Sequence, residues 1–167
     1  MEPDHNSTLL RLTRVRLLHE YPSLIDLCLG VLSDEELWWR PHERTNAVAN
    51  LILHLSWSNR YYFDQVIGGR DIGRNRAAEF TARDGYPKAR LRELWQGAVR
   101  VTERVLAELN PSRMTETTEV AGEAMPITQV LLHVTHHNAA HVGQIVWIAK
   151  MLHPGALVDV WMTMPGR

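Results

Sequence analysis

Cysteine, basic tracts and long apolar runs are all scarce in this sequence, and each scarcity excludes a class of protein. Cys28 is the single cysteine, so an internal disulfide framework is excluded and a reducing, cytoplasmic location is expected. Basic residues form no tract and the net charge is −1, so neither nucleic acid nor a membrane surface is an expected partner. No apolar run approaches the roughly 20 residues that span a bilayer.

The length and composition predict one ordinary globular domain. The chain has 167 residues, of which 45% are hydrophobic and 22% charged, which fits a single domain over residues 1–167 with one sizeable core. Its first residues lack the basic-then-apolar order of a signal peptide. Cys28 lies among apolar neighbours in "LIDLCLGVL", so we expect a buried, inert thiol rather than a nucleophile, which needs an electropositive setting.

Strand-like alternation is also lacking, whereas four segments repeat apolar residues with a helical period. The predicted helices span about residues 7–32, 45–67, 87–109 and 126–152. The stretch "GGRDIGRNRAAEFTARDGYP" after the second helix and the polar stretch after the third are interpreted as loops. The sequence therefore predicts an all-α four-helix bundle with long connections after helices 2 and 3.

Several local patterns refine this prediction. Ser7 is the expected N-cap of the first helix, and Pro22 is expected to kink or split it. Ser33 and Glu36 have the spacing of a capping box for a short helix. The tail "ALVDVWMTMPGR" is expected to form a strap across the bundle. One face of the first helix carries an apolar stripe: Leu10, Thr13, Leu17, Tyr21, Leu24 and Cys28.

The stretch "HVTHHNAAHVGQ" places four histidines within nine residues of the fourth predicted helix. At 100° per residue, His137 and His141 lie inside the apolar stripe one turn apart, and His133 lies at its edge. Side chains at this spacing have Cβ atoms about 6 Å apart, so both rings can approach one metal ion. His133 and His137 share the same spacing, so His133 is an alternative ligand. His136 lies off this face and is expected to contact solvent.

A metal site that stays open to substrate needs a third protein ligand, and the second predicted helix offers His54. It lies beside an apolar arc and in line with Asn50, Ser58 and Tyr61. Taken alone, His54 is more simply interpreted as a hydrogen-bonded core histidine, and the later pair as a polar stripe. Together the three histidines favour a divalent metal. We expect the other histidines to lie on the surface or in loops: His5, His19, His42 and His153.

These motifs are similar to those of the DinB family, also called DinB/YfiT-like metalloenzymes. The matching residues are His54 and "HNAAHVGQ" from His137 to Gln144. The segments "LSDEELWWRP", "NAVANLILHL", "HVGQIVWIAK" and "WMTMPG" resemble one branch of it, and the resemblance covers nearly the whole chain.

The resemblance implies a fold, a metal and a chemistry. It implies a four-helix bundle that holds a divalent metal, zinc or nickel, through His54, His137 and His141. Characterised relatives use low-molecular-weight thiols, as transferases or as a thiol-dependent isomerase, and many are homodimers. Many relatives carry arginine after the last histidine, where this chain has Val142, which removes one contact to an acidic substrate or thiol.

Three functional hypotheses follow from the metal site. The first is a thiol S-transferase acting on small electrophiles, because a metal stabilises a thiolate. Asn50, Trp57 and Tyr61 would line its cavity, and His133 and Gln144 would orient ligand rings or a bound water. The second is a hydrolase, which ranks lower because no Asp or Glu falls on either histidine line. Glu79, in the long loop, is expected to be solvated. The third is a non-catalytic homodimer that binds metal or a small ligand, with the "LWWRP" corner, residues 37–41, at its interface.

Overall fold

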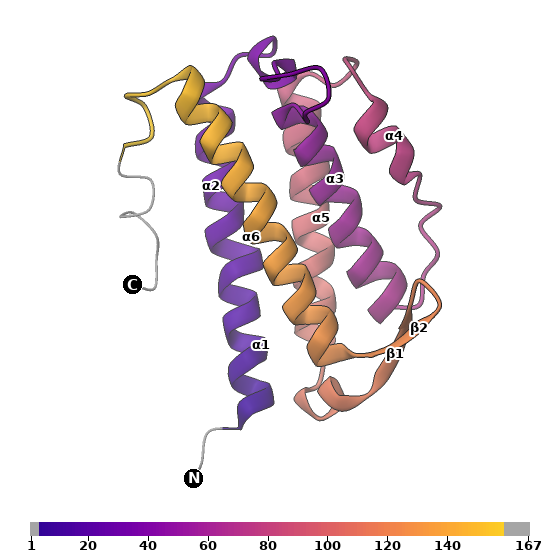
Figure 1. The fold of residues 1–167 in the computed structure, drawn as a ribbon. Helices are drawn as coiled ribbons and strands as arrows, with labels where there is room; N and C mark the ends of the chain where they lie inside the picture. The colour runs from indigo at the N-terminus through magenta and orange to yellow at the C-terminus, as the bar shows by residue number, and fades with distance from the viewer. Residues whose placement is uncertain (1–3, 159–167) are drawn as a thin grey trace.

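The computed structural model describes residues 4–158 and is built from four helical rods (Figure 1). The predicted all-α four-helix bundle is confirmed, with a small two-stranded sheet added at one end. Short 3₁₀ turns follow the first and third rods, at Glu36–Trp38 and Pro111–Thr115. The helices and strands are α1 (His5–Val15), α2 (Tyr21–Val31), α3 (Val48–Arg60), α4 (Arg76–Thr81), α5 (Lys88–Glu108), β1 (Thr117–Val120), β2 (Glu123–Pro126) and α6 (Ile127–Leu152).

The first rod runs through α1 and α2 without a break at Pro22. A π-helical turn, Arg16–Glu20, joins the two helices, and Pro22 stands in the first turn of α2. The missing donor of proline costs least there, so the predicted split does not occur. The N-cap is Asp4 rather than Ser7, because its carboxylate accepts hydrogen bonds from the backbone N–H groups of Asn6 and Ser7. All six residues of the predicted apolar stripe are buried.

α3 and α5 follow each other among the rods and run in the same direction. The connection between them therefore has to cross back over the length of the bundle. Lys88, at the start of α5, donates its backbone N–H to Asp34, which precedes α3. The far ends of α3 and α5 also meet, where Arg104 pairs with Asp64 of the π-helical segment Tyr61–Ile67 that extends α3. The connection 68–87 therefore climbs the full length of the bundle (Figure 1).

α3 is the central helix of the bundle. Every residue from Val48 to Ser56 is buried, polar ones included. Its neighbours are α5, α6 and α4. Because water does not reach this helix, its polar side chains need partners within the protein. That requirement decides where Asn50 and His54 point.

The segments expected to be loops contain regular structure. The connection 68–87 includes α4, whose N-cap Asn75 accepts a hydrogen bond from the backbone N–H of Ala78. The connection 110–126 includes the antiparallel pair β1–β2. The two strands are joined by Ala121 and Gly122, with φ of 52° and 89°, as a type I′ hairpin turn requires.

Other local predictions agree with the structure. Ser33 and Glu36 form the expected capping box, with each side chain bonded to the other's backbone N–H. Within residues 4–158, no helix is long and apolar enough to cross a membrane. Most of the tail predicted as a strap, including the "WMTMPG" motif, lies outside the described residues.

Candidate metal centre

Three histidines from two helices meet between α3 and α6. The ring centroids of His54 and His137 lie 4.9 Å apart, those of His54 and His141 4.9 Å, and those of His137 and His141 4.6 Å. One ligand atom from each ring lies within 4.8 Å of the other two. His54 is buried and the other two rings are half-buried. The structure therefore brings the three predicted ligands together, in a position to hold a metal ion.

Glu79 fixes the orientation and tautomer of His54. Its Oε2 lies 2.8 Å from His54 Nδ1. An Arg74 nitrogen lies 3.4 Å from the same Nδ1, but arginine only donates, so the closer carboxylate places the ring proton on Nδ1. The lone pair of His54 then stands on Nε2, which faces the other histidines. A carboxylate in this position is a common partner of metal-binding histidines.

Arg74 holds the Glu79 carboxylate from its other side. Arg74 Nε lies 2.6 Å from Glu79 Oε1, and a terminal nitrogen of Arg74 lies 2.9 Å from Oε2. Burial alone would raise the pKa of Glu79, but hydrogen bonds from Arg74 and His54 outweigh it and keep the pKa below its usual value. Glu79 is thus a buried, ionised acid, which corrects the expectation of a solvated loop residue.

Gln144 orients the ring of His141, as Glu79 orients that of His54. Its Oε1 lies 3.2 Å from His141 Nδ1, which leaves the His141 Nε2 lone pair free for the cluster. The ring of His137 has no such partner: its Nδ1 is buried and makes no hydrogen bond with any described residue. Gln144 therefore lies where a ligand-orienting residue was predicted.

Burial keeps two rings of the cluster, those of His137 and His141, neutral. It lowers the pKa of His137 to about 3, with further contributions from the neighbouring His141 and His54 rings. It also lowers the pKa of His141, although the hydrogen bond to Gln144 acts in the opposite direction. Neutral imidazole is the form that binds metals. At neutral pH these two rings are therefore ready to act as ligands.

The spacing of the ring nitrogens fits a common ion. Nε2 of His54 and Nε2 of His137 are 2.8 Å apart. Two ligands at about 2.0–2.1 Å from one ion stand roughly 2.9–3.4 Å apart at the usual coordination angles. Without an ion, this contact needs the proton of His137 on Nε2 as a donor. A bound cation instead accepts the lone pairs of both Nε2 atoms. Three imidazole ligands are a common set for a divalent metal ion.

The structure places the remaining predicted site residues around the cluster rather than in it. His133 is exposed, and its Nε2 lies 3.0 Å from the Tyr62 hydroxyl. It stacks on His137 with ring centroids 5.9 Å apart, so it is a neighbour and not one of the three converging rings. Tyr61 lies under the Arg74 guanidinium, 5.5 Å from its ring centroid. Trp57 stacks with Arg60 and lines a small cavity of about 160 Å³ together with Glu79.

Asn50 has a structural task that the sequence pattern did not reveal. Its side-chain amide donates to the carbonyl oxygens of Glu79 and Ala82, both at 3.0 Å. Its Oδ1 accepts a hydrogen bond from the backbone N–H of Ala47 at the start of α3. Asn50 therefore fastens the α4 segment to α3 and positions Glu79, rather than lining a cavity beside the histidines.

Arg74 and Phe80 are functional candidates that sequence reasoning missed, and Glu79 was named but expected in solvent. The Phe80 ring covers His54, with centroids 4.6 Å apart. One signal was available: Asn75 followed by "RAAEF" has the pattern of a capped helix. A helix there would have one buried face, and Glu79 and Phe80 are its adjacent residues with restricted exposure.

A cavity of about 480 Å³ opens beside the cluster. No histidine of the cluster lines this cavity; it is linked to His54 through Arg74 and Glu79, and to His137 through Tyr62 and His133. Its walls are partly aromatic and partly charged, so it suits a small polar molecule. The lining includes Tyr61, Tyr62, Gln65, Asp71, Arg74 and Arg76.

His153 lies in the loop after α6, as predicted, and is half-buried. Its Nε2 lies 3.0 Å from Glu36 Oε1, and this contact joins the end of α6 to the turn after α2. His5, His19, His42 and His136 are exposed, as predicted. The hydrogen bonds of the less exposed histidines therefore lie at the three-histidine cluster and between His153 and Glu36.

Solved structures with the same fold support the DinB-like resemblance. A DinB-like protein from Bacillus cereus matches 95% of this chain and 95% of its own, with a TM-score of 0.66 and 14% identity. A DinB-like protein from Bacillus subtilis matches 87% of this chain and 92% of its own, with a TM-score of 0.63 and 14% identity. At this identity the likeness establishes the fold alone. No curated protein sequence matches the chain.

A family model matches almost the whole chain, including every residue of the cluster. The match runs over residues 5–165, and the family is described as a protein of unknown function. The chain thus belongs to the DUF1572 family and has a DinB-like fold.

Proposed function

We propose that this protein binds a divalent metal, zinc or nickel, at His54, His137 and His141, and transfers a low-molecular-weight thiol to a small electrophile. The observation that carries the proposal is the convergence of three imidazoles, two of which have Nδ1 partners that leave the Nε2 lone pair facing the cluster. Three uncharged ligands leave the full positive charge of the ion at the site. When bound, such an ion lowers the pKa of a thiol at an open position and so supplies thiolate at neutral pH.

The chain's own residues orient the ligands and admit the substrates. Glu79 and Gln144 hold two of the rings, and the Phe80 ring packs against His54. The neighbouring cavity of about 480 Å³ provides space for a small electrophile. In the transfer, a sulfur–carbon bond forms, the bond to the leaving group breaks, and the thiol proton passes to solvent.

The nucleophile has to come from outside the chain. Cys28 is fully buried in the core. Burial raises the pKa of its thiol to about 12, so it carries almost no thiolate at neutral pH. An exogenous thiol is therefore the sulfur source that this proposal requires.

Hydrolysis is the second candidate because the same ion would activate water. It needs a general base within hydrogen-bond reach of that water. Glu79 is the carboxylate that contacts the cluster, but both its oxygens are engaged by Arg74 and His54. It faces Nδ1 of His54, whereas the cluster is formed on the Nε2 side. This arrangement favours thiol chemistry over hydrolysis.

Elemental analysis of freshly purified protein, followed by activity assays, tests the proposal. We expect about one equivalent of zinc or nickel per chain. We also expect metal-dependent formation of a thioether from a small thiol and an activated aryl halide. Ester hydrolysis without thiol turnover would favour the hydrolase. Bound metal with no turnover and a large loss of stability on chelation would favour a non-catalytic role. Failure to bind either metal would overturn the proposal.

We further propose a homodimer in the cytoplasm. The support for self-association is a set of apolar side chains exposed on α6: Leu132, Trp147 and Met151 are 54%, 58% and 45% exposed. Exposed apolar side chains gathered on one helix are typical of an interface. Sedimentation should show a dimer for the wild type and a monomer for Trp147→Asp, whereas a monomeric wild type would contradict this.

A further inference from the structure

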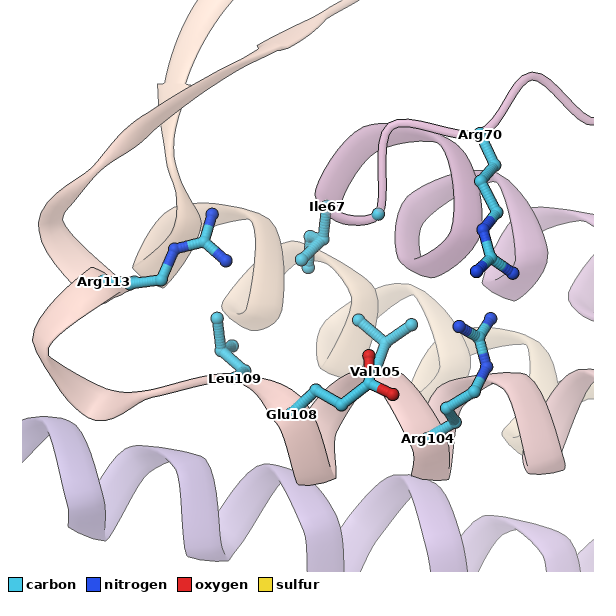
Figure 2. Close-up of a pocket in the computed structure, with 8 residues that line it drawn as sticks. Ile67, Arg70, Arg104, Val105, Glu108, Leu109 and Arg113 are labelled. Atoms are coloured by element: carbon cyan, nitrogen blue, oxygen red, sulfur yellow. The ribbon is translucent and has the colours of Figure 1, made fainter.

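A cavity lined by arginine lies at the end of the bundle where α3 and α5 finish. It measures about 230 Å³ and is bordered by Arg70, Arg104 and Arg113. In Figure 2 the guanidinium groups of Arg70 and Arg104 point toward each other from opposite walls, and Arg113 approaches from another side. The apolar floor consists of Ile67, Val105 and Leu109.

A second hollow continues from the first along α5. It measures about 400 Å³, and its lining includes Arg60, Arg100 and again Arg104. Arg104 is therefore a wall shared by both hollows. We name the two hollows together the arginine groove, defined by Arg60, Arg70, Arg100, Arg104 and Arg113.

Several of these guanidinium groups lack a carboxylate partner. Among the described residues, Arg104 pairs with Asp64 and Arg113 pairs with Glu116. Arg60, Arg70 and Arg100 form no ion pair within the same part of the chain.

The groove also contains an unsatisfied donor. Nε of Arg60 is buried and has no hydrogen-bond partner among the described residues, while its guanidinium stacks over Trp57. Glu108 lines the first hollow and offsets part of the positive charge. The groove nevertheless brings together several positively charged side chains, although the whole chain has a net charge of −1.

Guanidinium groups that face one another repel, and an anion between them removes that cost. Arginine also binds phosphate oxygens through paired N–H donors, which gives strength and geometric specificity. Two adjoining hollows that share one arginine suit a ligand with two linked anionic groups. We propose that the arginine groove binds a small molecule carrying a diphosphate group, with Arg104 contacting both phosphoryl groups.

Calorimetric titration of the full-length protein with inorganic pyrophosphate tests this inference. We expect saturable binding near physiological salt, at least tenfold tighter than for inorganic phosphate. Arg70→Ala, which breaks no ion pair, and Arg104→Ala should each weaken pyrophosphate binding at least tenfold. Arg90→Ala is the control, because it removes the same charge from an exposed position on α5 outside the groove and breaks only an exposed ion pair with Glu93.

Four outcomes would overturn the inference: no binding of pyrophosphate, equal affinity for phosphate and pyrophosphate, equal weakening by Arg90→Ala and Arg70→Ala, or loss of affinity in His141→Ala. Pyrophosphate also binds metal ions, so the titration is repeated on His141→Ala. Unchanged affinity in that variant places the ligand in the groove, whereas lost affinity places it at the histidine cluster. The groove and the proposed thiol chemistry therefore succeed or fail separately.

Discussion

Glu79 Oε2 contacts His54 Nδ1 at 2.8 Å, and His54 Nε2 faces His137 Nε2 at the same distance. The two nitrogens of one ring thus have different partners, an acid on one side and the histidine cluster on the other. A carboxylate that accepts a hydrogen bond from the Nδ1–H group raises the basicity of Nε2 and fixes the ring plane. The short helix α4 thereby contributes to the candidate metal centre without supplying a ligand.

Replacing Glu79 should weaken metal binding while leaving all three ligands in place. We expect Glu79→Gln to lower zinc affinity about 10- to 100-fold, because the neutral amide orients and polarises His54 less well. Competition with a chromogenic chelator measures the affinity. Glu93→Gln is the control, since that side chain is exposed on α5. Equal affinities for the two variants would show that Glu79 does not support the site.

Removing one ligand should abolish stoichiometric metal binding. His141→Ala leaves two imidazoles, too few to retain zinc or nickel through extensive dialysis. Mass spectrometric metal analysis should find less than about a tenth of an equivalent. His136→Ala should retain the metal, because that ring is exposed on another face of α6. Full metal content in His141→Ala would mean that other residues hold the ion.

Metal-free protein should lose stability as the pH falls from 6.5 toward 4.5. The pKa of His137 is about 3 in the folded state against 6.5 as its ordinary value, so the unfolded chain binds the proton first. The free energy of unfolding then falls with decreasing pH, by at most about 1.4 kcal/mol per pH unit for each such histidine.

Urea denaturation in the presence of a chelator measures this slope. The folded pKa of His141 is also lowered, so two rings contribute in the same direction. His137→Asn should flatten the dependence, while His136→Asn should leave it unchanged. A wild-type slope of zero, or one of opposite sign, would contradict the burial of neutral rings.

Cys28 should be inert toward thiol reagents in the folded protein. It is fully buried, and burial raises its pKa to about 12. We expect no labelling by a disulfide reagent at pH 8 under native conditions, and complete labelling in denaturant. Cys28→Ala should retain thiol-transfer activity. Loss of activity in a folded Cys28→Ala variant would make this cysteine the nucleophile and refute the requirement for an exogenous thiol.

The hairpin turn offers a site for stabilisation. Ala121 has a positive φ of 52°, which is unfavourable for alanine and well tolerated by asparagine. Ala121→Asn should raise the free energy of unfolding by about 0.5–1 kcal/mol, measured by urea denaturation. Ala124→Asn, in the adjacent strand, should give no gain because asparagine is disfavoured there. A gain of equal size in both variants would exclude the turn as its cause.

Helical periodicity predicted the elements that depend on local sequence. α5 begins and ends within one residue of the predicted bounds, and α6 likewise. The three histidines were found because their neighbours fix which face of each helix is buried. Pro22 misled the prediction, because a π-helical turn lets the rod continue into α2 with the proline in its first turn.

The features that were missed depend on contacts between distant residues. Glu79 looked solvated because nothing near it in sequence shows that Asn50 draws its backbone against α3. The hairpin was missed because its strands have four residues each, and "AG" is a weak turn signal when alanine takes the first position. Short elements of this kind are stabilised by what they pack against rather than by their own pattern.

The connection 68–87 couples the folding of the chain to the candidate metal centre, because its short helix α4 carries Glu79. A helix of six residues is unstable in isolation, and α4 is held against α3 by the Asn50 amide, which binds the carbonyl oxygens of Glu79 and Ala82. Segments with few anchoring contacts are the ones that open locally in the native state. Each such opening of α4 withdraws the acid from His54, so we expect the affinity of the candidate metal centre for an ion to depend on how firmly this short helix docks.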